Sequence, residues 1–332
     1  MAKRLSHAIR QLILRSDLMN QRLTIVFLAL IAMACFGRAA AQGPLVLDPA
    51  KLRLASLNAV VVDASAHRSV YAKGADEVTP IASLTKLMTA IVTLDANLPL
   101  DEPIAIDMDD LDYLKGTTSR LRMGAELPRR EMLRLALMSS ENRAASSLAR
   151  TYPGGTSAFV SAMNAKAALL GMANTRYADP TGLSAENVST ANDLAVLVAA
   201  AAEYPQIRDF STTGSHFVEV QPTGTVLGFN NTNKLVKSAE WDIQLSKTGY
   251  IREAGKCLVM LATIASKPFV IVLLDSAGKY TRLGDAQRVR HWLETGETLP
   301  VAAEAKPSPK TRKAKRSSYT PAAAKAAGSR RR

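Results

Sequence analysis

The chain has 332 residues, 47% of them hydrophobic, which is enough material for one large domain or two small ones. Its net charge of +13 is typical of a nucleic-acid-binding protein, but the positive charge lies at the two ends. Residues 1–41 carry +5, residues 305–332 carry +10, and residues 42–304 between them carry −2. The near-neutral central part excludes nucleic acid as an expected partner.

The first 41 residues are typical of an export signal. Arg22 precedes an apolar run over residues 23–36, and residues 39–41, all alanine, supply the small side chains that signal cleavage requires. The run is shorter than the roughly 20 residues that a membrane-spanning helix needs. We therefore predict a signal peptide over residues 1–41 and a periplasmic protein, which would contact the membrane only if the signal stays uncleaved. Met19 is an alternative start.

The next part of the chain predicts a hairpin followed by a helix. Residues 59–62 and 69–72 are β-prone runs separated by polar residues. Pro80 then breaks the chain just before a helix that begins around Ser83. An apolar stripe with helical spacing runs along that helix through Leu84, Leu87, Met88 and Ile91. Ser83 and Lys86 border the stripe, so we expect both to be largely shielded from water.

Helices dominate the middle of the chain, after an irregular excursion over residues 96–130. Helices are predicted at 132–137, at 144–149, around 159–170 with Gly171 as the stop, and from 191 to about 203 after a capping-box pattern at 190–193. The segment 179–182, Asp-Pro-Thr-Gly, has the composition of a turn.

From about residue 214 the pattern changes to strands. They are predicted at 217–220, 241–247, 256–264 and 269–274, and a helix follows at 286–293. A hairpin, then helices, then strands is an α+β layout in which an early strand can join the later sheet. Removal of the signal would leave Cys257 as the only cysteine, which excludes an internal disulfide and favours a core role.

Three short polar motifs follow one another along the chain. They are Ser83-Leu84-Thr85-Lys86, Ser140-Glu141-Asn142 and Lys247-Thr248-Gly249. Each motif is weak alone, and Ser276–Lys279 is a second Ser-x-x-Lys of the kind that chance supplies. Their order is the order found in class A β-lactamases and penicillin-binding proteins, although Glu141 stands where aspartate is usual. Glu141 itself is expected to be a solvated residue.

Together with the export signal, these motifs resemble the serine DD-peptidases, the low-molecular-mass penicillin-binding proteins, and in particular the penicillin-binding protein 7 type of D-alanyl-D-alanine endopeptidase. The residues that carry the resemblance are 80–86, 179–184, 231–235 and 245–250. The resemblance spans roughly residues 55–295. It implies a β-lactamase/DD-peptidase-like α+β fold over residues 42–304, with an antiparallel sheet, flanking helices and an inserted helical region.

The residues themselves suggest how an amide next to a carboxylate would be cleaved. Ser83 is the expected nucleophile and Lys86 its base, since residues three apart on a helix are neighbours. A lysine acts as a base only when it is neutral, so its pKa must be lowered, and burial and the second cation Lys247 both work in that direction. Ser140 is expected to relay a proton between the amines and the leaving nitrogen.

The other motif residues are expected to hold the substrate. Asn142 would accept a hydrogen bond from Lys86 and donate one to the substrate amide. Lys247 and the Thr248 hydroxyl would bind the substrate carboxylate. Gly249 would leave room for the substrate backbone along the strand edge.

The resemblance implies further assignments. The oxyanion would lie between the backbone N–H groups of Ser83 and Tyr250. Arg282, after the last strand, would help to bind the carboxylate. The implied reaction is hydrolysis of D-alanyl bonds in the peptide stems of peptidoglycan, as an endopeptidase on cross-links, a carboxypeptidase or both. β-Lactam antibiotics would be covalent inhibitors.

Two other functions stay open. A class A-like β-lactamase would need an acid that activates water, for which Glu186 is the candidate, although its surroundings do not match. A non-catalytic wall-binding protein of the same fold is the second alternative, against which the complete set of motifs argues.

Several features predict no special role. His67, His216 and His291 lack the Gly-x-Ser-x-Gly partner of a hydrolase triad, and no metal-ligand or nucleotide-binding pattern is present, so no metal or cofactor is expected. Residues 305–332 predict a disordered basic tail, whose use, if any, would be loose attraction to anionic envelope polymers.

Overall fold

The computed structural model describes residues 47–297 and 299–301. The expected signal peptide, residues 1–41, and the expected basic tail, residues 305–332, lie outside these ranges, as do the first and last few residues of the expected domain 42–304. Within the described part of the chain, every helix is too short or too polar to cross a bilayer.

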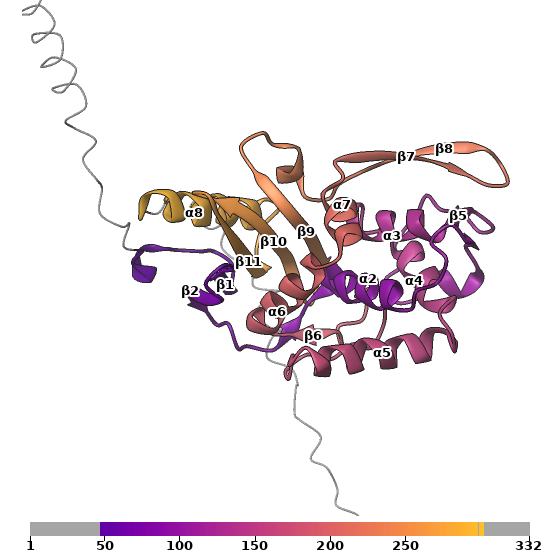
Figure 1. The fold of residues 1–332 in the computed structure, drawn as a ribbon, viewed down its shortest axis with the longest axis horizontal. Coiled ribbons are helices and arrows are strands. Elements are labelled where there is room, and N and C mark those ends of the chain that lie inside the picture. Colours follow the sequence, from indigo (N-terminus) through magenta and orange to yellow (C-terminus); the bar gives the residue numbers. More distant parts are fainter. Residues whose placement is uncertain (1–46, 298, 302–332) are drawn as a thin grey trace, which may run out of the picture. The chain divides into compact units, whose positions relative to one another are not determined.

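A five-stranded antiparallel sheet organises the fold, with the strand order β2-β1-β11-β10-β9 (Figure 1). The strand bounds are Asn58–Asp63 for β1, Arg68–Lys73 for β2, Asp242–Ile251 for β9, Gly255–Ile264 for β10 and Lys267–Ser276 for β11. The expected hairpin is present, and β1 pairs with β11, with Val60 opposite Val272. An early strand therefore joins the later sheet, as the α+β prediction allowed, and β9 is left at the edge.

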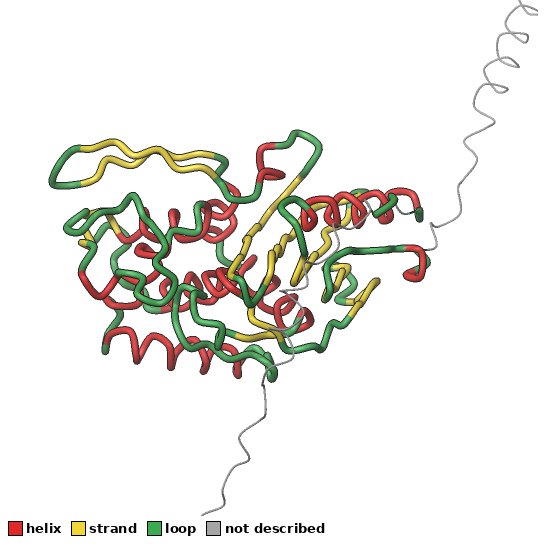
Figure 2. The backbone as a smooth tube through the Cα atoms, turned by 180° about the vertical axis from the view of Figure 1, so that it is seen from behind, coloured by secondary structure: helices red, strands yellow, loops and turns green. Residues whose placement is uncertain are grey.

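Helices cover both faces of this sheet (Figure 2). α8, Thr281–Thr295, packs on one face, where Leu258 of β10 and Trp292 of α8 share one buried cluster. Val259, the next residue in β10, belongs to the second cluster, which includes the apolar residues of α2 and α6. Because both faces are buried, β10 is a continuous apolar run and not an alternating pattern.

Apart from α7, the helices on the second face follow the sequence prediction closely. They are α2, Lys86–Asp95; α3, Arg129–Met138; α4, Asn142–Arg150; α5, Gly155–Leu169; α6, Ala191–Ala202; and α7, Pro205–Thr212. The stripe from Leu84 to Ile91 is buried, as its spacing predicted. Thr190 caps α6 by accepting a hydrogen bond from the Asp193 N–H at 3.1 Å.

The start of the first helix differs from the prediction. Ser83 lies in a separate 3₁₀ turn, Ala82–Thr85, and α2 begins only at Lys86. Ala82 has φ +49°, a left-handed value through which an α-helix does not continue. In a 3₁₀ turn residues three apart eclipse each other, so Ser83 and Lys86 still share one face.

Some elements were not predicted. The helix α7 is one, and the strand β8, Thr225–Asn230, is another; β8 pairs with β7, Ser215–Val220, in a two-stranded sheet of their own. The strand expected at 217–220 therefore exists but does not join the main sheet. Short pairs are formed by β3, Thr79–Pro80, with β6, Val188–Ser189, and by β4, Pro103–Ala105, with β5, Glu126–Pro128.

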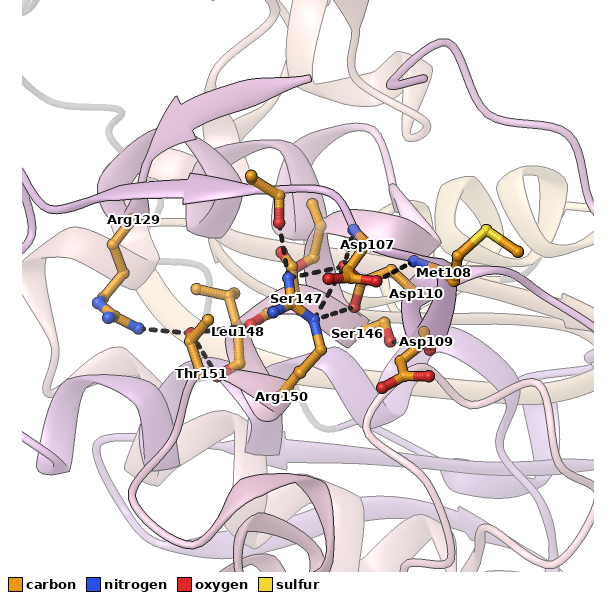
Figure 3. Close-up of polar contacts among 12 residues, drawn as sticks. Asp107, Met108, Asp109, Asp110, Arg129, Ser146, Ser147, Leu148, Arg150 and Thr151 are labelled. Atoms are coloured by element: carbon orange, nitrogen blue, oxygen red, sulfur yellow. Dashed lines mark hydrogen bonds and ion pairs between the residues drawn. The ribbon is translucent and has the colours of Figure 1, made fainter. Parts of the chain in front are cut away.

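The excursion over residues 96–130 is held on α4 by Arg150 (Figure 3). The guanidinium Nη2 of Arg150 lies 3.0 Å from Asp110 Oδ2 and donates to the Ala105 carbonyl at 2.6 Å. The Asp110 side chain is completely buried. This ion pair fixes the excursion beside α4, whose first residue is Asn142.

Candidate active site

The first motif brings an amine against a hydroxyl. The 3₁₀ turn puts Lys86 Nζ 2.9 Å from Ser83 Oγ. Lys86 is fully buried, whereas Ser83 is half-buried, so the hydroxyl stays accessible to a substrate while the amine does not contact water. This is the arrangement of a nucleophile and an adjacent base.

Lys86 has two further acceptors. Its Nζ donates to Asn142 Oδ1 at 2.8 Å, as predicted, and to the Thr181 carbonyl at 2.6 Å, which the sequence did not reveal. A neutral amine keeps two N–H donors and one lone pair. The neutral form can therefore satisfy Asn142 and Thr181 and still turn its lone pair toward the Ser83 hydroxyl.

The Thr181 carbonyl is held in place by the turn that begins at Asp179. Asp179 Oδ1 accepts hydrogen bonds from the N–H groups of Thr181 and Gly182 at 2.6 and 2.7 Å. Gly182 has φ +79°, and a Cβ there would lie 2.0 Å from the Ala82 carbonyl oxygen. Only glycine lets this turn lie against the turn that carries Ser83.

Ser140 and Lys247 form a second hydroxyl–amine pair. Ser140 joins α3 to α4 with φ +61°, a left-handed value that is strained for serine. Its Oγ accepts from Lys247 Nζ at 2.8 Å, and the same amine donates to the Thr248 carbonyl at 2.9 Å. The three motifs therefore meet, with Asn142 joining the Ser140 turn to Lys86.

Burial lowers the pKa of both lysines. The pKa of Lys86 falls from 10.5 to about 8, although Asp179 and two other carboxylates work in the opposite direction. The pKa of Lys247 also falls, and the charges of Lys86 and Arg282 lower it further. The sequence had predicted that burial and Lys247 would together lower the pKa of Lys86. Burial does so, whereas repulsion between the cations lowers the pKa of Lys247, because Lys86 has carboxylates around it and Lys247 has a further cation.

The third motif lies on the edge strand β9. Thr248 Oγ1 donates to Thr232 Oγ1 at 2.7 Å. A Cβ on Gly249 would lie 2.9 Å from the Ile81 carbonyl oxygen and 3.2 Å from Ser83 N. The reason predicted for this glycine was room for a substrate backbone. The structure gives another reason, because a side chain at Gly249 would push β9 away from the Ser83 turn.

Tyr250 and Arg282 complete the predicted set. The Tyr250 side chain is 60% exposed, while its backbone follows Gly249 along β9. Arg282 lies in the first turn of α8, and its Nε and Nη1 are buried without a hydrogen-bond partner among the described residues. Burial lowers the pKa of Arg282. A buried guanidinium without a partner is suited to bind an anion.

Other sequence candidates lie away from this group. Ser276 of the second Ser-x-x-Lys is buried against another serine, with 2.6 Å between the two hydroxyls. Glu186 forms an exposed ion pair with Arg176 at 2.6 Å. His216 Nε2 lies 2.7 Å from Glu131 Oε2. No hydrogen bond or ion pair among the described residues links any of the three to Ser83.

Two further predictions concern single residues. Glu141, expected to be solvated, is partly buried and caps α4 by accepting from the Arg143 N–H at 3.3 Å. Cys257 is buried as expected, and burial raises the pKa of its thiol to about 12, so the thiol stays protonated. Within residues 47–297 and 299–301, no cluster of three His, Cys, Asp or Glu could hold a metal ion.

Residues 46–278 match the family model described as D-alanyl-D-alanine carboxypeptidase. The chain belongs to this family. It is a serine-type DD-peptidase of peptidoglycan, as the three motifs predicted. The predicted DD-peptidase-like α+β fold is confirmed, since the structural relatives include a DD-transpeptidase and a penicillin-binding protein.

Members of the family resemble the chain over most of its length. The D-alanyl-D-alanine endopeptidase of Pseudomonas aeruginosa is 50% identical over 86% of this chain and 93% of the relative, and that of Escherichia coli is 48% identical over 86% and 92%. Among solved structures, the Streptomyces K15 DD-transpeptidase is 28% identical, with a TM-score of 0.68 over 73% of this chain and 98% of its own. Penicillin-binding protein D2 of Listeria monocytogenes, solved with bound cefotaxime, is 28% identical, with a TM-score of 0.61 over 74% and 98%.

Proposed function

We propose that this DD-peptidase cleaves D-alanyl bonds in peptidoglycan cross-links, with Ser83 as the nucleophile and Lys86 as its base. One observation carries the assignment: the buried Lys86 amine, with a pKa of about 8, lies 2.9 Å from the Ser83 hydroxyl. Part of Lys86 is therefore neutral near pH 7 and ready to accept a proton. The preference for cross-links is supported by two relatives named D-alanyl-D-alanine endopeptidase.

In the first step, neutral Lys86 takes the proton of Ser83 Oγ, and the oxygen attacks the carbonyl carbon of the D-alanyl residue. The carbonyl oxygen becomes an oxyanion between the N–H groups of Ser83 and Tyr250, which stabilise the negative charge. The close approach of Gly249 to the Ser83 nitrogen supports this assignment, because Tyr250 N follows Gly249 directly.

In the second step the C–N bond breaks and the leaving nitrogen takes a proton. Ser140 is the relay: its hydroxyl proton passes to the leaving nitrogen and is replaced from the protonated amine of Lys247, 2.8 Å away. The proton that Lys86 took from Ser83 then restores the charge of Lys247, so Lys86 is neutral again. The product is an ester on Ser83 and a free amine. Water then attacks the ester carbon and gives one proton to neutral Lys86. As the ester C–O bond breaks, the Ser83 oxygen takes that proton from Lys86, which leaves a carboxylic acid and the restored Ser83 hydroxyl.

The carboxylate next to the cleaved bond would be bound by Lys247, the Thr248 hydroxyl and Arg282. The pKa of Lys247 is lowered in the free enzyme. A bound carboxylate would stabilise the protonated form of Lys247 and so raise this pKa again. Asn142, already bonded to Lys86 at 2.8 Å, would donate its N–H to the substrate amide. The feature that supports the inclusion of Arg282 is that its buried Nε and Nη1 have no hydrogen-bond partner among the described residues.

Fluorescent penicillin tests the nucleophile. The wild-type enzyme should be labelled stoichiometrically and keep the label for minutes, because the Asp179–Asn192 segment contains Glu186 as its acid besides Asp179, and Glu186 is paired with Arg176 on the surface. Ser83→Ala should not label at all, while its unfolding transition stays unchanged. Labelling of that variant would disprove the serine assignment, and rapid turnover of the drug would favour a β-lactamase.

Defined muropeptides test the substrate. Purified residues 42–304 would be incubated with a cross-linked dimer and with a pentapeptide monomer, and the products would be separated by mass. Conversion of the dimer to monomers would support the endopeptidase function. Release of D-alanine from the pentapeptide with no cleavage of the dimer would show that the enzyme is a carboxypeptidase only.

The proposal includes export to the periplasm. The supporting pattern is the signal-like segment over residues 1–41, followed by a catalytic domain over 42–304 and a basic tail over 305–332. The amino-terminal sequence of the protein recovered from a periplasmic extract checks this, and a start near residue 42 is expected.

A further inference from the structure

Three lysines and two tyrosines gather beside the proposed carboxylate site, and we call Lys234, Lys256, Lys279, Tyr250 and Tyr280 the basic rim. Lys256 Nζ lies 3.9 Å from the centre of the Tyr250 ring. The amines of Lys279 and Lys234 lie 5.3 and 5.7 Å from the centre of the Tyr280 ring. Both rings are more than half exposed, so the rim is open to a ligand.

The rim is built from three segments that border the third motif. Tyr250 directly follows Lys247-Thr248-Gly249 on β9, and Lys256 is its cross-strand partner on β10. The strands β9 and β10 lie side by side in Figure 1. Lys234 comes two residues after Thr232, whose hydroxyl bonds to that of Thr248. Lys279 and Tyr280 lead into Arg282 at the start of α8. A ligand that extends beyond the carboxylate site therefore meets the rim next.

The positive charge of the rim is not balanced by salt bridges among the described residues. The salt bridges within the described part of the chain include neither Lys234, Lys256, Lys279 nor Arg282. The nearby Glu253 is paired with Lys115, at 2.7 Å. Burial lowers the pKa of Lys256, and repulsion from the charges of Arg282 and Lys279 lowers it further. An anion would relieve this repulsion.

We propose that the basic rim binds carboxylates of the departing peptide stem and so favours cross-links over pentapeptides. This inference rests on the proposed endopeptidase function. When a pentapeptide is cleaved, the leaving group is one D-alanine, whose single carboxylate is taken by the site around Lys247. When a cross-link is cleaved, the leaving group is a whole stem that carries further carboxylates. These further carboxylates would extend beyond Thr248 and Arg282 and so reach the rim.

The double variant Lys256→Ala/Lys279→Ala tests the rim. Partly exposed ion pairs each contribute modestly, so loss of two should lower kcat/KM for a cross-linked muropeptide dimer by about tenfold, mainly through KM. Hydrolysis of the pentapeptide and labelling by fluorescent penicillin should stay within about twofold of wild type. A dimer whose spare stem carboxylates are amidated should be cleaved equally by variant and wild type. Lys267→Ala is the matched control, because Lys267 lies at the opposite end of the β10–β11 pair.

Two results for the Lys256→Ala/Lys279→Ala variant would overturn the proposed role of the rim. One is an unchanged kcat/KM for the dimer, and the other is an equal loss of kcat/KM for dimer and pentapeptide. A wild-type enzyme that cleaves no dimer would instead disprove the endopeptidase function. The role of the rim would then be tested by measuring the Kd of the dimer for Ser83→Ala enzyme with and without the two lysine substitutions. Equal Kd values would refute the proposed role of the rim. Weakened binding of wall polymer without peptide stems would also refute it, because the rim would then be a general polyanion site.

Discussion

At the scale of single residues, the chemistry depends on how Lys86 is solvated. In water an ammonium is stabilised by hydration, and full burial removes that hydration. The three oxygens around Nζ replace it in part, and carboxylates such as Asp179 add favourable charge, so the pKa falls to about 8 and no further. The amine is therefore basic enough to take a proton from Ser83 and neutral often enough to do so.

This balance predicts the pH dependence of acylation. A lysine is neutral above its pKa, so the rate of penicillin acylation should rise with pH, with an apparent pKa near 8, and then level off. The rise can be measured as the second-order rate constant for acylation by fluorescent penicillin between about pH 6 and pH 10. Lys86→Ala should lose at least about a hundredfold at every pH. A wild-type rate that is flat or falling across the range would contradict the role of Lys86.

At the scale of elements, the site depends on two turns packed against each other. Gly182 faces Ala82 so closely that a Cβ would lie 2.0 Å from a backbone oxygen. We expect Gly182→Ala to lower the free energy of unfolding by about 3 kcal/mol and to abolish acylation, because the Thr181 carbonyl would leave Lys86. Chemical denaturation and penicillin labelling measure the two effects.

Gly171→Ala is the matched control for this substitution. Gly171 has nearly the same φ, +75°, but a Cβ there would meet nothing within 4 Å. It should therefore show only the backbone strain of a left-handed alanine, about 1 kcal/mol, with normal labelling. Equal losses at both glycines would mean that packing of the two turns is not what requires Gly182.

The ion pair between Arg150 and Asp110 supports the excursion beside Asn142. Arg150→Ala would leave the buried Asp110 carboxylate without its charge partner, and we expect the free energy of unfolding to fall by about 2–3 kcal/mol. Arg290→Ala removes two exposed pairs, with Glu294, which is 36% exposed, and with Glu240, which is 72% exposed, and should lose under about 1 kcal/mol. The double variant Arg150→Ala/Asp110→Ala should lose less free energy of unfolding than the sum of the losses in the two single variants. Strict additivity in denaturant unfolding would show that the pair does not couple.

Much of the site could be predicted because its chemistry is carried by side chains. Ser83, Lys86, Ser140, Asn142 and Lys247 all come together as their motifs indicated. The Thr181 carbonyl could not be assigned in this way, since every residue type supplies a carbonyl. Its only sequence signal is the Asp-Pro-Thr-Gly turn, which indicates a special backbone but not what the backbone faces.

The unpredicted elements have equally local causes. The strand β8 contains Gly228, which weakens a strand pattern, yet a Cβ there would lie 2.8 Å from the Phe217 ring, so the glycine makes room for its hairpin partner. The helix α7 is short and buries little beyond Ile207 and Phe210. Its only clear signal is Pro205 in its first turn, which is also compatible with a loop.

At the scale of the whole molecule, the site exists only when distant parts of the chain meet. The Ser83 turn, the Ser140 turn and β9 are separated by most of the described sequence, and the sheet joins them because β1 pairs with β11 and β9 lies beside β10. Penicillin labelling therefore reports folding as well as chemistry. The ends of the chain differ from this body in charge: ten Lys and Arg lie in residues 305–332, whereas residues 42–304 carry −2.

That separation of charge predicts that binding to the wall and catalysis can be uncoupled. Deletion of residues 305–332 should leave penicillin acylation unchanged but reduce co-sedimentation with isolated sacculi at low salt, because ten positive charges no longer meet an anionic polymer. The difference between the two forms should vanish by about 0.5 M salt, where charges are screened within a few ångströms. A tail of equal length with its ten basic residues replaced by glutamine should behave like the deletion. If that neutral tail restores binding, or if the difference persists in high salt, the attraction is not electrostatic.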